Sequence, residues 1–472
     1  ITTTTGDDAM ESADRSNNPP RKEVIIIGAG PAGAAAAAWL ARAGHAVRVL
    51  ERSHFPRFSI GESLLPRCMQ HLEACGLMEA AAAGGYQRKT GAAFTRRGEH
   101  RVIDFRDKFS DGPGTTWQVE RADFDQRLIE GARAAGAEVE FGVTVTGFTP
   151  ARAAQSDATG HAQGPRLTLA DGRELEAAFV LDASGYGRVL ARLESLERDP
   201  RLEPRMALFG HVHDGIADLA PPAAGYRRDN ILIASHPTHP DVWYWLIPFA
   251  NGRASLGVVG PRELIEPAAE DDAQTRLWQW VMEEPRLAEL LRDARPANAV
   301  QSLGGYSADV SRLHGPGYAL LGNAGEFLDP VFSSGVTIAL ESALRAAPLV
   351  GRELTATRDE QRPDWASEYE QPLRRGIEVF REFVTAWYDS RLTDIIYHPE
   401  PHARIRQMIS AVLAGYAWDT TNPFVSASRR RLTALARLTA PEQTLAPDAV
   451  PESDSLADLS AFGRAASVGE NR

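Results

Sequence analysis

The sequence predicts an α/β protein in which a Rossmann-like dinucleotide-binding domain is joined to a β-sheet region and a helical C-terminal region. Three stretches support this prediction. Residues 23–52 combine an apolar strand, a glycine turn and an alanine-rich helix, residues 205–260 hold several β-type runs, and residues 364–437 follow a helical pattern. A chain of 472 residues is too long for one simple core, so more than one structural unit is expected.

The first stretch is a complete βαβ unit. Residues 24–27 form a continuous apolar run, as expected of a buried parallel strand, and Gly44 stands where a helix should end. In the turn GAGPAG, the glycines permit a tight bend, close approach of a pyrophosphate and close packing of helix on strand. The helix N-terminus offers free N–H groups to phosphates, and an acidic side chain at the end of the second strand can accept hydrogen bonds from a ribose. The predicted dinucleotide-binding residues of this unit are Gly28, Gly30, Pro31, Ala32, Gly33, Glu51 and Arg52.

Composition excludes several other classes of protein. No apolar run reaches the length of about eighteen residues that a membrane-spanning helix needs, and the first residues lack the order of a secretory signal, so a cytoplasmic location is expected. The net charge is −12, and the two terminal segments carry more than half of it, which argues against a nucleic-acid partner. Two cysteines are too few for a disulfide framework or a metal cluster, so no metal site is expected.

The expected boundaries follow the changes of pattern along the chain. Both ends lack hydrophobic periodicity and are expected to be disordered. The predicted parts are a leader (1–20), a discontinuous dinucleotide-binding domain (21–200 and 300–350), a substrate-side β-sheet region (201–299), a helical C-terminal region (351–440) and a tail (441–472).

Three further segments resemble the FAD monooxygenases of the hydroxybenzoate-hydroxylase type. They are TWQVERADFDQRL (116–128), DASGYG (182–187) and YALLGNAGEFLDP (318–330). The resemblance implies a glutathione-reductase-type domain that binds FAD rather than NAD. It adds Arg121, Asp182, Gly322, Asn323, Asp329 and Pro330 to the expected cofactor-binding residues. Asn323 stands where these families usually have Asp, and because an amide keeps the hydrogen-bonding capacity, we expect FAD binding to survive.

Other segments resemble the flavin-dependent halogenases. WYWLIP (243–248) fits the WxWxIP signature of that family, and FPRFSIGESLLP (55–66), RKTGAAF (88–94) and LDPVFSSGVTIALESA (328–343) resemble further family segments. The resemblance covers roughly residues 23–345 and weakens in the helical C-terminal region. It implies that Gly61, Glu62, Ser63, Gly335 and Val336 also contact FAD.

The family resemblance implies a specific chemistry. Reduced FAD and O2 give a C4a-hydroperoxyflavin, which chloride or bromide attacks to form hypohalous acid. The halide is expected at Ser333, Ser334 and Gly335, and Lys89 is expected to direct the acid onto the substrate. Trp243, Trp245 and Ile247 are expected to separate substrate from flavin, with Pro248 stiffening that wall. No second GxGxxG turn appears for a nicotinamide, so a separate NAD(P)H flavin reductase is expected to supply reduced FAD.

One departure from the family pattern restricts the substrate. Tryptophan halogenases place a glutamate directly before the Ser-Thr-Gly of the halide loop, and Phe332 occupies that position here. A phenol or pyrrole ring activates itself and does not need that carboxylate. The expected substrate is therefore a small aromatic molecule of the phenol or pyrrole type, either free or carried on an acyl or peptidyl carrier protein.

Other interpretations of these motifs remain open. A non-halogenating FAD aromatic hydroxylase and a geranylgeranyl-reductase-type oxidoreductase would share the fold and most flavin motifs, and a flavoprotein that is only a binding partner is a further alternative. Lys89 by itself could be a surface lysine, and the tryptophan pair could be core packing. The arginines at 429–431 fit either an exposed helix face or a docking surface for a carrier protein.

Overall fold

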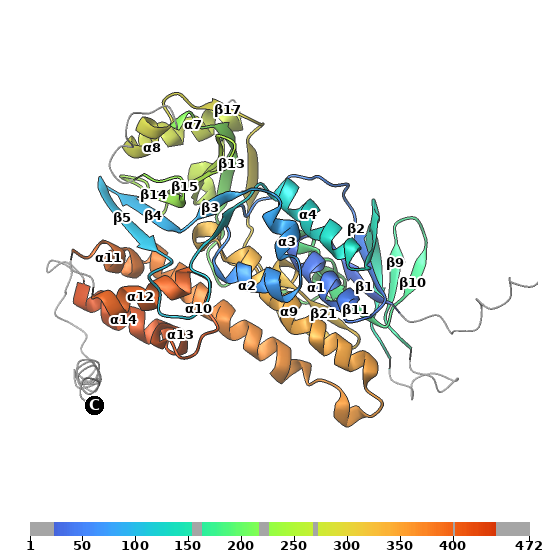
Figure 1. The fold of residues 1–472 in the computed structure, drawn as a ribbon. Helices are drawn as coiled ribbons and strands as arrows, with labels where there is room; N and C mark the ends of the chain where they lie inside the picture. The colour runs from blue at the N-terminus through green and yellow to red at the C-terminus, as the bar shows by residue number, and fades with distance from the viewer. Residues whose placement is uncertain (1–22, 153–162, 217–225, 268–271, 400–401, 440–472) are drawn as a thin grey trace, which may run out of the picture.

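A computed structural model describes residues 23–152, 163–216, 226–267, 272–399 and 402–439 (Figure 1). The predicted leader (1–20) and tail (441–472) lie outside these ranges. No described helix combines the length and the apolar character that crossing a membrane requires. Within the same ranges, no group of His, Cys, Asp and Glu side chains is arranged to hold a metal ion, and both cysteines are buried free thiols.

A six-stranded sheet forms the centre of the first part of the fold. Its order is β20-β21-β11-β1-β2-β7, and all pairings are parallel except that of β20 with β21. The strands are β1 (Val24–Ile27), β2 (Val47–Glu51), β7 (Glu138–Phe141), β11 (Phe179–Asp182), β20 (His314–Gly315) and β21 (Tyr318–Leu320). Every residue of β1 is buried, as expected of a strand covered on both faces. This sheet confirms the predicted α/β class.

Helices and smaller sheets complete this part. The helix α1 (Pro31–Arg42) packs against both α4 (Arg121–Ala134) and α9 (Ser334–Thr355). A hairpin turn at Asp171-Gly172 joins β9 (Arg166–Leu169) and β10 (Glu174–Glu176), which form a three-stranded sheet with β8 (Val145–Thr149). The remaining short elements are α2 (Arg67–Ala74), α3 (Met78–Ala82), β3 (Gln87–Lys89), β6 (Thr116–Gln118), α5 (Val189–Leu193), β12 (Glu197–Arg198) and β19 (Asp309–Val310).

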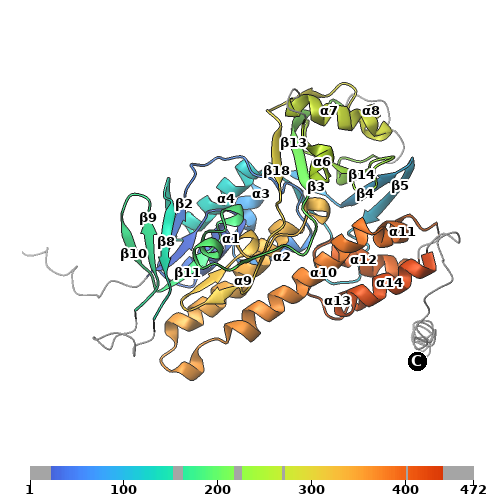
Figure 2. The same cartoon turned by 180° about the vertical axis from the view of Figure 1, so that it is seen from behind.

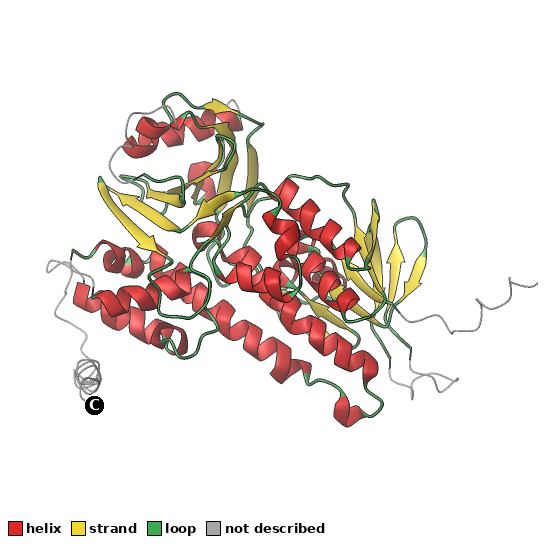
Figure 3. Ribbon diagram, in the orientation of Figure 1, coloured by secondary structure: helices red, strands yellow, loops and turns green. Residues whose placement is uncertain are grey.

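A second, eight-stranded sheet stands beside the first (Figures 1 and 3). Its order is β17-β13-β16-β15-β14-β4-β5, with β18 also paired to β13. The strands are β4 (Gly91–Arg96), β5 (Glu99–Asp104), β13 (Met206–His213), β14 (Asn230–Ser235), β15 (Trp243–Pro248), β16 (Arg253–Gly260), β17 (Arg295–Pro296) and β18 (Gln301–Gly304). This sheet is wider than the predicted substrate-side region of residues 201–299. It recruits β4 and β5 from the range assigned to the dinucleotide-binding domain, because β4 pairs in parallel with β14.

The two faces of the eight-stranded sheet belong to different cores. On β15, Tyr244 and Leu246 pack toward the helices α6 (Arg262–Ile265), α7 (Ala273–Glu283) and α8 (Pro285–Leu290). Trp243, Trp245 and Ile247 belong to the main core on the other face. This alternation follows from the two-residue period of a strand, so one face of β15 presents both tryptophans to the rest of the protein.

Helices form the C-terminal region, as predicted. They are α10 (Gln371–Tyr388), α11 (Arg391–Tyr397), α12 (Ala403–Leu413), α13 (Pro423–Ser426) and α14 (Ser428–Thr439). In Figures 1 and 2 they lie against the eight-stranded sheet, and α10 also runs beside α9. Ile377, Phe380, Val384 and Trp387 are buried along one side of α10, in agreement with the helical pattern predicted for residues 364–437.

Candidate active site

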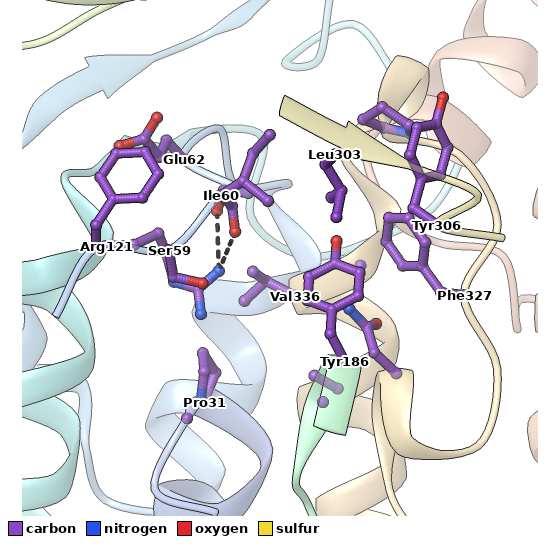
Figure 4. Close-up of a pocket in the computed structure, with 18 of the residues that line it drawn as sticks. Pro31, Ser59, Ile60, Glu62, Arg121, Tyr186, Leu303, Tyr306, Phe327 and Val336 are labelled. Atoms are coloured by element: carbon purple, nitrogen blue, oxygen red, sulfur yellow. Dashed lines mark hydrogen bonds between the residues drawn. The ribbon is translucent and has the colours of Figure 1, made fainter. Parts of the chain in front are cut away.

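A cavity of about 500 Å³ lies where the two sheets meet (Figure 4). Residues that directly follow β1, β2, β11 and β21 line it, so it lies at the carboxyl ends of the parallel strands, where ligands bind in open α/β sheets. Figure 4 shows Ile60 and Glu62 on one side and Leu303, Tyr306 and Phe327 on the other. The volume falls within the range of about 300–1,000 Å³ that is usual for small-molecule sites.

The glycine turn has no room for side chains. Gly28 has a φ of +99°, and a Cβ added there would lie 2.5 Å from the carbonyl oxygen of Ala183. A Cβ on Gly33 would lie 1.9 Å from the carbonyl oxygen of Gly28. The carboxylate of Glu51 accepts hydrogen bonds from the backbone N–H groups of Ala29 (2.8 Å) and Ser53 (2.9 Å). With the N-terminus of α1 at the cavity, this turn fits the pyrophosphate of a dinucleotide.

Two arginines hold the loop that follows β2. Arg121 donates to both carboxylate oxygens of Asp125 (2.7 and 2.9 Å) and to the carbonyl oxygen of Ile60 (2.7 Å; dashed in Figure 4). Arg57, which the sequence analysis did not single out, forms an ion pair with Asp125 at 3.3 Å. Its Nη2 lies within 3.6 Å of the position that a Cβ on Gly30 would occupy, so it brings positive charge to the glycine turn. The sequence feature that could have indicated Arg57 is its positive charge shortly after the second strand.

The structure separates the predicted cofactor residues into two groups. Gly33, Asp182, Gly322 and Asp329 do not line the cavity and instead shape the loops around it. Asp182, for example, accepts from the backbone N–H groups of Ser184 (2.9 Å) and Leu190 (2.6 Å). The predicted residues that line the cavity are Gly28, Gly30, Pro31, Ala32, Glu51, Arg52, Gly61, Glu62, Ser63, Arg121, Asn323, Pro330, Gly335 and Val336.

The tryptophan pair forms part of the cavity wall. Trp243, Trp245 and Ile247 line the cavity, while Pro248 is buried at the end of the strand and does not. The two indole centroids are 5.9 Å apart, and Nε1 of Trp245 donates to Oγ of Ser255 at 3.0 Å. Gly257 lies opposite Trp245 on β16, where a Cβ would come within 2.3 Å of the indole. The glycine therefore makes the space that the second indole occupies.

A buried polar network fixes the other indole. Nε1 of Trp243 donates to the hydroxyl of Tyr388 at 2.9 Å, and that hydroxyl donates to Oδ2 of Asp329 at 2.9 Å. Tyr306 also donates to Oδ2, at 3.3 Å, and burial raises the pKa of Asp329. The guanidinium of Arg205 lies 3.6 Å from the centre of the Tyr388 ring. No local signal in the sequence indicated Tyr388, because its partners come from distant segments.

Lys89 is a buried amine next to the cavity. Its side chain is on β3 and is 1% exposed, and it does not line the cavity. Nζ donates to Oγ of Ser63 at 2.7 Å and to the carbonyl oxygen of Leu64 at 2.9 Å, and it lies 5.4 Å from the centre of the Phe105 ring. Burial lowers the pKa of Lys89 from its usual 10.5 to about 7. An amine that exchanges its proton near neutral pH thus contacts Ser63, which lines the cavity.

The loop before α9 places a helix N-terminus at the cavity. Ser333 adopts a left-handed conformation (φ +56°) directly before the helix, and Ser333 and Gly335 line the cavity, whereas Ser334 is buried beside it. The free N–H groups and the dipole of a 22-residue helix favour an anion at this point. Phe332 is buried and meets Trp387 edge to face, with ring centroids 5.9 Å apart.

A buried carboxylate–histidine pair joins the cavity to the eight-stranded sheet. Glu62 lines the cavity, and its Oε1 lies 2.7 Å from Nε2 of His211 on β13. Both side chains are almost fully buried. The pair connects the loop that carries Ser63 to the second sheet.

Comparisons with known proteins agree with this geometry. The family described as "FAD binding domain" matches residues 21–195. The chain is 31% identical over 356 residues to the flavin-dependent halogenase armH3 of Armillaria mellea, with 71% of this chain and 68% of that protein covered. It is 28% identical to the 1H-pyrrole-2-carbonyl-[peptidyl-carrier protein] chlorinase of Pseudomonas fluorescens, over 81% of this chain and 87% of that protein.

Two solved structures extend the likeness to the whole fold. A flavoprotein/dehydrogenase from Cytophaga hutchinsonii superposes with a TM-score of 0.80 at 37% identity, covering 88% of this chain and 98% of that one. The flavin-dependent brominase Bmp2 superposes with a TM-score of 0.72 at 25% identity, with the same coverage of both chains.

Proposed function

The chain belongs to the flavin-dependent halogenases, and from this premise we propose that it transfers a halogen to an electron-rich aromatic ring through Lys89. The observation that carries the proposal is the contact between buried Lys89 and Ser63, a residue of the cavity wall. In the overall reaction, an aromatic C–H and hypohalous acid give an aryl halide and water.

FAD is the cofactor that the cavity fits. The glycine turn, Glu51 and Arg57 would hold its adenosine diphosphate half, and the segment 60–63 and the loop before α9 would surround the remainder. When bound in its reduced form, FAD would supply two electrons to O2, so that reduced FAD, O2, a halide ion and a proton give oxidised FAD, hypohalous acid and water. The residues of this chain then have to bind the halide, exclude the substrate and guide the acid.

The loop before α9 is the proposed halide site. Ser333 lines the cavity here, and its own N–H donates to the carbonyl oxygen of Pro330 at 3.0 Å. The N–H groups of Ser334 and Gly335, in the first turn of α9, would then serve as the donors that chloride or bromide needs. Phe332 and its contact with Trp387 keep the surroundings of this turn apolar. A weakly hydrated, buried anion site favours reaction of the halide because water cannot compete for it.

The wall of β15 is the proposed partition. Trp243, Trp245 and Ile247 face the cavity from a strand whose other face is sealed by a separate core. Both indole N–H groups are hydrogen-bonded, so both rings are fixed in orientation. A substrate on the Lys89 side would be kept from the flavin and could receive halogen only through hypohalous acid.

Lysine is a rare residue in this chain, which supports a chemical role for Lys89. The sequence contains only three lysines, Lys22, Lys89 and Lys108, and otherwise uses arginine as its cation. A guanidinium stays charged at any physiological pH, whereas a buried amine can exchange its proton. With a pKa of about 7, Lys89 can donate a hydrogen bond to hypohalous acid as an ammonium or react with it as an amine.

The proposed substrate is a ring of the phenol or pyrrole type. Phe332 offers no carboxylate to activate a less reactive ring, so the substrate has to be electron-rich itself. Two relatives, from Pseudomonas fluorescens and Pseudoalteromonas luteoviolacea, act on pyrroles attached to a peptidyl carrier protein, which supports a carrier-tethered substrate here. We also propose a separate NAD(P)H flavin reductase as the partner that supplies reduced FAD.

A substrate panel tests this proposal. The FAD-loaded protein, a flavin reductase and bromide are incubated with phenols and pyrrole-2-carboxylates, each free and as a pantetheine thioester. Mass spectrometry then reads the bromine isotope pattern. We expect bromination of the electron-rich rings, faster for the thioesters, and loss of product in Lys89→Ala. Turnover of reduced FAD with no brominated product from any ring would contradict the proposal.

A non-halogenating oxidoreductase is the second candidate function. The likeness to the Cytophaga hutchinsonii flavoprotein/dehydrogenase, at 37% identity, favours it. Such an enzyme would return the same products with and without bromide. The panel therefore discriminates between the two candidates.

A further inference from the structure

Ser63 connects the cofactor cavity to Lys89. Its Oγ accepts the 2.7 Å hydrogen bond from Nζ, and Ser63 lines the cavity although Lys89 does not. The second acceptor of Nζ is the carbonyl oxygen of the next residue, Leu64. In the described part of the chain, both acceptors of the buried amine thus come from one short segment.

This segment is held rigidly against the ribbon that carries Lys89. The backbone N–H of Leu64 donates to the carbonyl oxygen of Trp117 at 3.0 Å, and that of Val119 donates to the carbonyl oxygen of Glu62 at 2.7 Å. Trp117 lies in β6 and Val119 directly follows it, and β6 pairs with β3. Ser63 forms a bridge to Gln118 of β6, and Lys89 is on β3, so the two residues are held in a fixed relation on either side of β6.

The hydroxyl can serve the amine and the cavity at the same time. A serine hydroxyl has one donor and two acceptor positions, and Nζ uses one acceptor position. Among the described residues, none accepts the hydroxyl hydrogen of Ser63. That hydrogen is available to a polar group in the cavity that Ser63 lines.

We propose that Ser63 is a positioning residue that holds the amine of Lys89 at the cavity wall and links it by hydrogen bonding to a reactive group in the cavity. The inference rests on the proposed function, in which that group is hypohalous acid. Ser63 then keeps the acid in contact with Lys89 as it leaves the flavin side. Without the hydroxyl, the amine loses an acceptor, and the acid escapes into solution.

The first test reads the amine directly and does not depend on turnover. Because the chain has three lysines, lysine labelled with ¹³C at Cε gives three signals in the oxidised, FAD-loaded protein, and Lys89→Arg assigns one of them. We expect the Lys89 signal to titrate at a lower pH in Ser63→Ala than in the parent, because the ammonium has lost an acceptor. Ser63→Thr, which keeps the hydroxyl, should titrate close to the parent.

Thr116 on β6, the strand paired with β3, provides a matched control. Thr116 pairs with Lys89 and is 2% exposed, and its hydroxyl has no hydrogen-bond partner among the described residues. Thr116→Val should leave the Lys89 titration unchanged. Ser63→Cys, whose thiol is a weak acceptor, is the second variant if Ser63→Ala does not fold. A parent-like titration in the folded Ser63 variants that lack the hydroxyl overturns the proposal.

The second test follows the hypohalous acid. With reduced FAD and bromide, a β-diketone trap in solution competes with a protein-bound aromatic substrate. We expect Ser63→Ala to lower aryl bromide per reduced FAD about tenfold and to raise bromination of the trap, and we expect the same of Lys89→Ala. The double variant should match Lys89→Ala alone, because both changes remove one linkage. If Ser63→Ala divides bromine between the substrate and the trap as the parent does, the proposal is overturned.

The two tests separate failure of this inference from failure of the proposed function. If the parent protein brominates neither trap nor substrate, the proposed function is overturned, and the role of Ser63 toward hypohalous acid is overturned with it. The NMR titration would still decide whether Ser63 holds Lys89. If the parent brominates its substrate and both tests leave Ser63→Ala unaffected, only the inference about Ser63 is overturned.

Discussion

Nε1 of Trp243 donates a 2.9 Å hydrogen bond to the hydroxyl of Tyr388, 145 residues further along the chain. The same hydroxyl donates to Asp329 in the loop before α9. One phenol therefore ties the C-terminal helix α10 to the cavity wall and to the loop of the proposed halide site. This gives the C-terminal helices a defined relation to the active site.

Tyr388→Phe should loosen this junction. The change leaves the N–H of Trp243 and the buried carboxylate of Asp329 each without one partner, which should lower the free energy of unfolding by about 1–3 kcal/mol. Denaturant titration monitored by tryptophan fluorescence measures it. Tyr306→Phe is the control, since its bond to Asp329 is longer, at 3.3 Å, and does not involve Trp243. Equal effects of the two changes would contradict the assigned role of Tyr388.

Gly33→Ala should weaken FAD binding. A Cβ at this position would lie 1.9 Å from the carbonyl oxygen of Gly28, so the turn and α1 must move apart. We expect the Kd for FAD, measured by quenching of flavin fluorescence, to rise about tenfold or more. Gly304→Ala is a suitable control, because the nearest heavy atom to its Cβ would be 3.9 Å away. Parent-like FAD affinity in Gly33→Ala would show that the turn does not hold the pyrophosphate closely.

Lys89 should make folding stability depend on pH in a defined direction. Its pKa falls from 10.5 to about 7 on folding because burial disfavours the charge. The loss of folding stability that this burial causes is therefore complete below pH 7 and disappears as the pH approaches 10.5. The unfolding free energy of Lys89→Met minus that of the parent should therefore decrease as the pH rises from about 7 to about 10. Denaturant melts across this range measure the difference.

The control for this titration is Lys108→Met. Burial also lowers the pKa of Lys108, but its side chain is only partly buried. The unfolding free energy of Lys108→Met minus that of the parent should therefore change less with pH. A flat difference for Lys89→Met would mean that Lys89 keeps an ordinary pKa in the folded protein.

Trp245→Ala should open the partition. Removing a buried indole costs about 3–5 kcal/mol of stability and leaves a gap beside Gly257 in the cavity wall. With the wall open, the aromatic substrate can meet the flavin directly, and hydroxylated product should appear beside the halogenated one. Mass spectrometry of the products detects the added oxygen. Trp278→Ala, on the helix side of the eight-stranded sheet, should give no hydroxylation. If Trp245→Ala only slows halogenation, the indole is packing and not a barrier.

Local patterns predicted much of the fold. The glycine turn, the β-type runs within residues 205–260 and the helical pattern of residues 364–437 can each be recognised within short segments, because a strand or helix repeats its environment every few residues. The pairing of β4 with β14 joins segments more than a hundred residues apart, so the boundary of the second sheet could not be read from either one. The full extent of the eight-stranded sheet is seen only in the structure.

The same limit applies to the site. The resemblance to the halogenases implied roles for Lys89 and Ser63 separately, but nothing in the sequence indicated that one holds the other. Asp182 and Asp329 have the residue type expected of cofactor contacts, yet their carboxylates accept hydrogen bonds from nearby backbone N–H groups instead. Tyr388 carries no motif at all. Such partners emerge only when the tertiary fold brings distant segments together.

The most direct measurement follows the flavin itself. The FAD-loaded protein is reduced without oxygen and mixed rapidly with oxygenated buffer, with or without bromide, while the flavin absorbance and a β-diketone trap are monitored. We expect bromide to accelerate the return of oxidised flavin and brominated trap to appear at the same rate. If bromide changes neither the flavin absorbance nor the trap, the protein does not oxidise halide, and the function proposed for this cavity is contradicted.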